Sequence, residues 1–155
     1  GDEQGFVSDG GDRYAREDMF ASAVPSYNDN DLIATDATTA QANFDTSSPL
    51  FLALQEMAAI RQSHPVLRHG DLTVRAASHT APVLALERRN WEGGETYLVA
   101  FNASSEAQTM NVAVDGRLLA WTSVIGDCAP AATASGSVQL VLPPMDYLIC
   151  RSVPG

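Results

Sequence analysis

The chain has 155 residues, of which 45% are hydrophobic and 18% charged, a composition typical of a folded globular protein rather than a disordered one. Its net charge of −10 argues against nucleic acid or an anionic membrane surface as a partner, and no apolar run reaches the roughly 20 residues that cross a bilayer. The acidity is concentrated early in the chain. Residues 1–47 hold ten acidic residues and two arginines, whereas residues 48–155 hold nine acidic residues and seven arginines.

Residues 1–47 show little hydrophobic periodicity. Turn-forming residues recur there, as in Gly-Gly-Asp at residues 10–12 and Asn-Asp-Asn-Asp at residues 28–31. Neither run fits the spacing of an EF-hand calcium loop, so we expect turns, no metal ion and no cofactor. Since a structureless segment of this length is unusual inside a compact domain, we predict a long functional loop that depends on a scaffold.

The next segment has the marks of a helix. Ser47 or Ser48 can cap it, and Pro49 suits its first turn. Apolar residues then recur at spacings of four, three and three residues, at Leu50, Leu54, Met57 and Ile60. Pro65 ends the run, because the residue before a proline avoids the helical region. We therefore predict one amphipathic helix within residues 48–66.

After Gly70 the pattern changes to the alternation typical of strands. Turn residues separate seven short apolar segments, at residues 72–76, 83–89, 96–101, 110–114, 118–125, 138–142 and 145–151. A loop rich in Ala, Ser and Thr is expected at residues 129–137. The pattern predicts a mainly β fold, an antiparallel Greek-key β-sandwich over residues 67–155.

Two cysteines, Cys128 and Cys150, fit neither a zinc site nor a redox motif. They permit one disulfide, which would stabilise the fold by roughly 3 kcal/mol on the chain-entropy model. The alternative is two separate thiols, with that of Cys150 buried in a strand.

Three early segments carry a family resemblance: Gly-Asp-Glu-Gln-Gly-Phe at residues 1–6, Asp-Gly-Gly-Asp at residues 9–12 and Arg-Glu-Asp-Met-Phe at residues 16–20. Followed by one helix and a run of short strands, they resemble the C-terminal part of glycoside hydrolase family 13, the α-amylase family.

The resemblance implies a domain organisation. Residues 1–47 would be the end of strand eight of a (β/α)8 barrel with its long βα loop, and residues 48–66 would be the last barrel helix. Residues 67–155 would be the C-terminal β-sandwich domain. The missing barrel of the same parent chain is then the expected partner, and barrel active sites lie in such βα loops.

The resemblance also implies a function. Retaining glycosidases need two carboxyl groups about 5 Å apart, and the family carries its catalytic residues on barrel strands four, five and seven. All of them would precede Gly1, so we expect no catalytic residue here and no activity from the chain alone. The parent would be a secreted or periplasmic hydrolase or transglycosylase acting on an α-glucan, with a structural, supporting β-domain. The alternatives are a carbohydrate-binding module and a protein-interaction β-sandwich.

Several residues are candidates for a site. Asp12 and Arg16 would bind substrate in the intact enzyme, although their spacing also fits a simple ion pair on one helical turn. Trp91, at a predicted hairpin tip, could stack on a sugar or cap the edge of the sandwich. The adjacent acids Asp2 and Glu3 are expected at a strand end, facing opposite ways.

Overall fold

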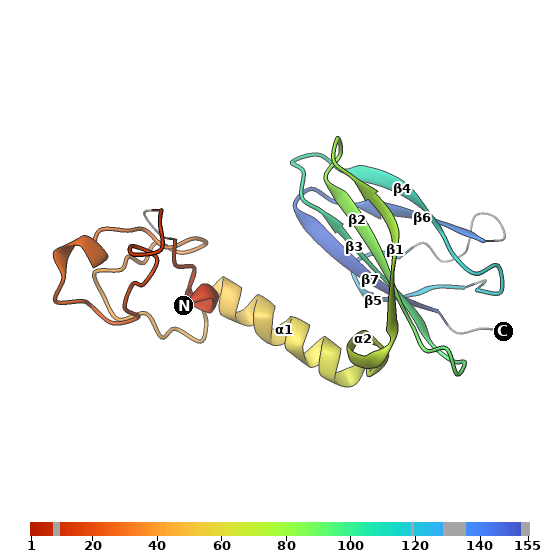
Figure 1. Cartoon of the computed structure of the whole chain (residues 1–155), viewed down its shortest axis with the longest axis horizontal. Coiled ribbons are helices and arrows are strands. Elements are labelled where there is room, and N and C mark those ends of the chain that lie inside the picture. The colour runs from red at the N-terminus through yellow and green to blue at the C-terminus, as the bar shows by residue number, and fades with distance from the viewer. Residues whose placement is uncertain (8–9, 119, 129–135, 153–155) are drawn as a thin grey trace. The chain divides into compact units, whose positions relative to one another are not determined.

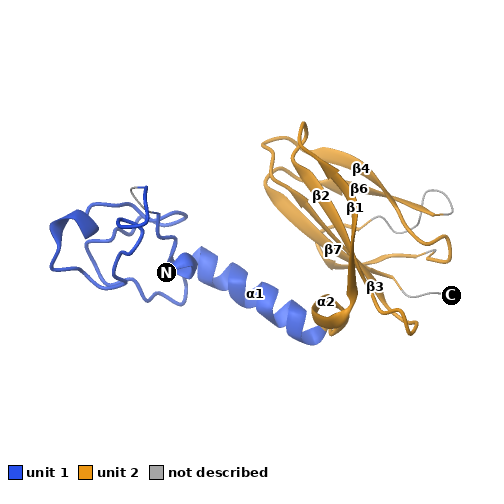
Figure 2. Ribbon diagram, in the orientation of Figure 1, with its two compact units in different colours: residues 1–63 blue, residues 64–155 orange. Residues whose placement is uncertain are grey.

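A computed structural model describes residues 1–7, 10–118, 120–128 and 136–152. The chain divides into two compact units, unit 1 (residues 1–63) and unit 2 (residues 64–155) (Figures 1 and 2). Within the described ranges, no helix has both the length and the apolar character that crossing a membrane requires.

Unit 1 is mostly irregular before its helix. It contains two short 3-10 helices, η1 (Asp2–Gln4) and η2 (Pro25–Tyr27), and the α-helix α1 (Pro49–Ser63) (Figure 1). In this structure the segment predicted to end a strand forms η1 instead, closed by Gly5 at a left-handed φ of 85°. A strand without a neighbour leaves its backbone groups unpaired, whereas a 3-10 turn pairs them locally. Asp2 and Glu3 therefore lie on a helical turn and not on a strand.

Helix α1 differs from the predicted amphipathic helix. Besides the stripe that contains Leu54, it carries Phe51 and Leu52 on other sides, and none of its residues is buried. Successive residues turn by about 100°, so Leu52 and Leu54 lie on nearly opposite sides of the helix. Large apolar side chains thus lie on more than one side of the helix, although Gln55, Glu56 and Arg61 interrupt them, so the helix offers apolar surface to more than one neighbour.

Unit 2 begins with the short helix α2 (Val66–His69) and continues with strands. The strands are β1 (Asp71–Ser78), β2 (Val83–Arg89), β3 (Thr96–Asn102), β4 (Gln108–Ala113), β5 (Thr122–Ile125), β6 (Ser137–Leu142) and β7 (Asp146–Ser152). Five form one sheet in the order β1-β2-β3-β7-β5, and β4 pairs with β6 in a second sheet, all antiparallel (Figure 1). The predicted mainly β, antiparallel architecture is confirmed.

The core lies between the two sheets because alternate residues of each strand face inward. On β3 these are Leu98 and Ala100, and on β6 they are Val138, Leu140 and Leu142, all fully buried. Each large side chain buried in this way contributes roughly 1.5–3 kcal/mol relative to an exposed one.

Strand β5 is shorter than predicted. The pattern indicates a strand over residues 118–125, but the strand begins only at Thr122. Leu118 and Trp121 are nevertheless buried in the core. The backbone before β5 turns instead, with the Leu118 amide donating to the Asp115 carbonyl. Most of the predicted loop at residues 129–137 lies outside the described residues.

Strand β1 contains an irregularity that lets a charged pair enter the sandwich. Its register against β2 shifts between Val74 and Ala76, so that Arg75 is the extra residue. The Arg75 guanidinium donates to the buried carboxylate of Glu87 at 2.7 Å. Bulges of this kind redirect a side chain, and here the bulge supplies the charge that a buried carboxylate needs.

Asn102 closes the far end of β3. Its side chain is 2% exposed and donates to the carbonyls of Glu106 and Pro143, both at 2.8 Å. Its Oδ1 accepts from the amide and the hydroxyl of Ser104. The sequence Asn-Ala-Ser at residues 102–104 has the form of a glycosylation sequon, but its amide is an internal structural group.

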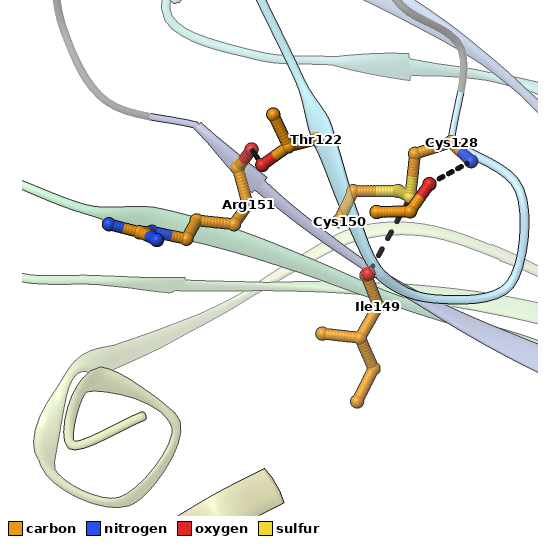
Figure 3. The surroundings of a disulfide bond; sticks show 6 residues. Thr122, Cys128, Ile149, Cys150 and Arg151 are labelled. Atoms are coloured by element: carbon orange, nitrogen blue, oxygen red, sulfur yellow. Dashed lines mark hydrogen bonds between the residues drawn. A yellow bond between two sulfur atoms is a disulfide. The ribbon is translucent and has the colours of Figure 1, made fainter. Parts of the chain in front are cut away.

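Cys128 and Cys150 form a disulfide that ties the segment after β5 to β7 (Figure 3). Their Cα atoms are 5.7 Å apart, and the Cys128 amide donates to the Ser123 hydroxyl at 3.0 Å. The Cys128 sulfur also lies 3.5 Å from the Ile149 carbonyl oxygen. We interpret this as a packing contact, because a disulfide sulfur carries no proton to donate.

Replacing both cysteines by alanine is expected to lower the free energy of unfolding by roughly 3 kcal/mol, since the bridge closes a loop with a sequence separation of 22 residues. Urea denaturation of the whole chain measures this change. A reducing agent should destabilise the natural chain by a similar amount and leave the double variant unaffected. An unchanged urea midpoint of the natural chain on reduction would contradict the bridge.

Candidate functional site

The most exposed aromatic group of unit 2 is Trp91, in the connection between β2 and β3. The hairpin tip is shaped by Asn90, whose side-chain oxygen accepts from the Glu92 amide at 3.1 Å. Gly93 and Gly94 follow with φ of 95° and 110°, a backbone that favours glycine. Trp91 is 67% exposed, whereas Trp121 in the core is 3% exposed. Trp91 therefore does not cap the sandwich edge.

Arg89 holds one face of the indole of Trp91. The central carbon of its guanidinium lies 4.7 Å from the ring centroid, a cation–π arrangement. The guanidinium is fixed on its other side by Asp115, whose carboxylate accepts from Arg89 at 3.1 Å and from Arg117 at 2.6 Å. Hydrogen bonds from Arg117, and then the charge of Arg89, hold the pKa of Asp115 well below its usual range.

A groove of about 360 Å³ lies beside this tryptophan, on the side of α2. It is lined by Pro65, Val66, His69, Gly70, Asp71, Arg89, Asn90, Trp91 and Glu92. The exposed side chains of His69, Asp71 and Glu92 have no hydrogen-bond partner among the described residues. An aromatic ring and unpaired polar groups in one concave site are the usual components of a small-molecule site.

His64 has a structural role beside the groove. The buried Tyr97 hydroxyl donates to Glu95 at 2.7 Å and lies 2.8 Å from Nδ1 of His64. Because the hydroxyl proton is used on Glu95, Nδ1 of His64 is the donor in the second bond. Burial, and then the neighbouring carboxylate of Glu95, raises the pKa of Tyr97 well above its usual value. Arg151 pairs with Glu95 and completes the network.

In unit 1, Asp12 and Arg16 form an ion pair with a distance of 2.7 Å. Their side chains are 87% and 71% exposed, so the pair contributes little to stability. The simpler of the two predicted arrangements is thus present in the chain, and a role in substrate binding stays a proposal.

No local pattern in the sequence indicates how the loop of unit 1 is held. The buried side chain of Gln4 donates to the carbonyl of Asp45 at 3.0 Å and accepts from its amide at 2.9 Å. The hydroxyl of Ser48 donates to the carbonyl of Glu3. These bonds join η1 to the start of α1 through polar groups. In the described part of the chain, no three His, Cys, Asp or Glu residues are grouped to hold a metal ion.

The fold is shared with solved structures of sugar-acting enzymes. An α-amylase from H. orenii matches with a TM-score of 0.51 and 16% identity over 70% of this chain and 21% of that one. A debranching enzyme from Nostoc punctiforme matches with a TM-score of 0.52 and 23% identity over 77% of this chain and 25% of that one. Trehalulose synthase MutB from Pseudomonas mesoacidophila MX-45 is 29% identical, with a TM-score of 0.50, over 70% of this chain and 18% of that one. The sandwich is thus of the β-domain class found in α-amylase-type enzymes.

A curated α-amylase from Streptomyces lividans is 33% identical over 153 residues, which make up 98% of this chain and 17% of that protein. No family model matches the chain. The chain belongs to the α-amylase family of glycoside hydrolases, as the motifs at its start predicted. It spans only 17% of the length of the curated relative that it matches.

Acidification is expected to destabilise unit 2 partly through Asp115. A carboxyl whose pKa is lowered by folding stabilises the fold above its unfolded pKa, near 3.9, and this stabilisation is lost as pH falls toward the folded value. Asp115→Asn should therefore reduce the free energy of unfolding at pH 6 and have a much smaller effect near pH 2. Urea denaturation at both pH values tests this.

The exposed Asp127, which has no ion-pair partner among the described residues, provides the matched control. Asp127→Asn should change stability little at either pH. An equal loss from Asp115→Asn at both pH values would show that its ionisation is unimportant.

Proposed function

We propose that this chain completes and supports the catalytic barrel of a larger enzyme that acts on α-glucans by hydrolysis or transglycosylation. Residues 1–47 would form the barrel's last βα loop, and residues 48–66 would provide its last helix. Residues 67–155 would be the supporting β-domain. The observation that carries this proposal is the apolar, unburied surface of α1.

The physical argument starts from the cost of exposed apolar surface. Leu52 and Leu54 are 48% and 49% exposed on nearly opposite sides of α1, and Met57 is exposed as well. Covering such side chains is worth about 25 cal/mol for each Å² removed from water. Only a helix with neighbours on several sides gains this energy, and the helices that surround a (β/α)8 barrel have such neighbours.

The irregular part of unit 1 points the same way. Phe20, Ile33 and Phe44 are all exposed although they are large and apolar. Polar side-chain bonds, such as those between Gln4 and Asp45, hold this part together without burying these groups. A loop with exposed apolar side chains and a polar scaffold fits a segment that packs against further protein.

The reaction type rests on the relatives. The curated relative is named an α-amylase. A mutant of trehalulose synthase MutB, 29% identical to this chain, has been solved in complex with the substrate sucrose. The similarity to these two enzymes supports the proposal that the parent protein acts on a glycosidic bond. In this chain Asp12 and Arg16 offer a carboxylate and a guanidinium that could bind sugar hydroxyls once the barrel is present.

A chimera tests the proposal directly. Residues 1–155 would replace the matching segment of the Streptomyces lividans α-amylase, and release of reducing sugar from starch would be measured. The chimera is expected to be active and the chain alone to be inactive, because the two carboxyl groups of a retaining glycosidase must act together. Starch hydrolysis by the chain alone would contradict the proposed division of roles.

The double substitution of Leu52 and Leu54 by glutamine tests the role of α1. In the chain alone it should change the free energy of unfolding by no more than about 0.5 kcal/mol, because the side chains are exposed. It should also reduce binding of an apolar dye. In the chimera the same change should cost several kcal/mol, measured by urea denaturation. Leu98→Ala in the core is the control, since it should cost about 2–5 kcal/mol in both proteins.

A further inference from the structure

We propose that the groove beside Trp91 is a binding site for a neutral gluco-oligosaccharide. The groove comprises the residues of α2, β1 and the β2–β3 connection named above, and Figure 1 shows α2 and this connection at the same end of the sandwich. The choice of an α-linked sugar as the expected form rests on the proposed function.

The first argument is the exposure of the indole. Trp91 leaves 67% of its surface in water, so folding gains little from one of the two largest apolar side chains in the chain. The turn and the ring are nevertheless restrained, by the Asn90 side chain that accepts from the Glu92 amide and by Arg89 on one face of the indole. A large apolar ring held rigidly at a surface loses little conformational entropy on binding, which favours its use as a contact group.

The second argument is the direction from which a ligand can approach. Arg89 occupies one face of the Trp91 ring at 4.7 Å, and Asp115 keeps the guanidinium in place. A ligand that stacks must therefore use the other face or the edge. The flat, C–H-rich side of a pyranose ring suits such a surface, because it is apolar while its hydroxyl groups project around the rim.

The third argument is the charge of the groove. The one guanidinium among its lining residues, that of Arg89, shares the carboxylate of Asp115 with Arg117, so its charge is only partly compensated. Asp71 and Glu92 add two carboxylates that have no partner in the described part of the chain, and these disfavour a phosphate or any other anion. Carboxylates and an imidazole are acceptors and donors for hydroxyl groups. A neutral polyol thus satisfies the groove better than an anion does.

The test is a titration of the full chain with maltotetraose, followed by the indole N–H signals in NMR spectra. The signal of Trp91 should shift with a millimolar dissociation constant, and that of the buried Trp121 is the internal reference. Trp91→Ala should weaken binding about tenfold or more, measured by calorimetry. Asp71→Asn combined with Glu92→Gln should also weaken it. Met145→Ala, at an exposed residue outside the groove, should leave the affinity unchanged.

Cellotetraose and tetramethylammonium complete the experiment. A larger shift with maltotetraose than with cellotetraose supports an α-glucan site, and equal shifts support a sugar site without selectivity for the linkage. No shift of Trp91 with either sugar at millimolar concentration overturns the proposal. A shift with tetramethylammonium alone also overturns it, because the groove would then bind cations. An inactive chimera would count against the proposed function and leave these outcomes unaffected.

Discussion

The burial of the inward faces of β2, β3 and β7 against β4 and β6 is the interaction on which unit 2 depends. Each central strand contributes alternate side chains to one core. Two polar side chains that enter it find partners, whereas the indole nitrogen of the core residue Trp121 has none among the described residues. Glu87 meets Arg75 at the bulge in β1, and Asn102 meets backbone carbonyls. An unpaired buried polar group costs about 1–3 kcal/mol, more than the roughly 0.8 kcal/mol that a buried methylene contributes, so these partners are as necessary as the apolar contacts.

Unit 1 meets the same requirement only in part. Its irregular segment pairs its polar groups through side chains such as Gln4 and Asn43. Its helix leaves apolar side chains uncovered on more than one side. Unit 2 therefore encloses a hydrophobic core of its own, whereas unit 1 exposes apolar surface to solvent. This contrast, together with 33% identity to 17% of an α-amylase, is what favours a larger enzyme over an independent module.

The sequence predicts those features that depend on residues close together in the chain. Alternation over residues 83–89 and 138–142 predicts β2 and β6 almost to their ends, because one face of each strand is buried. The pattern also predicts the helix, but it does not predict which of its sides are apolar. The stripe that begins at Leu50 does not include Leu52, which lies on another side. The motif at residues 1–6 predicts the end of a barrel strand, yet this segment contains a 3-10 turn and pairs with no strand among the described residues. Register shifts such as the bulge at Arg75 depend on two strands at once, and neither strand's own pattern contains them.

The candidate site shows the same limit more clearly. Trp91 stands out in the sequence because it sits in a turn, and this position alone allows either stacking on a ligand or packing on the sandwich. In the structure Trp91 is 67% exposed, and Asp115, which lies 26 residues after Arg89, holds that guanidinium over one ring face. A contact over this separation follows from the way β4 returns across the sandwich, and no local pattern encodes it. The polar lining from α2 and β1 depends on the same folding. A surface site of this kind is thus a product of the tertiary fold, although each of its residues is ordinary in its own segment.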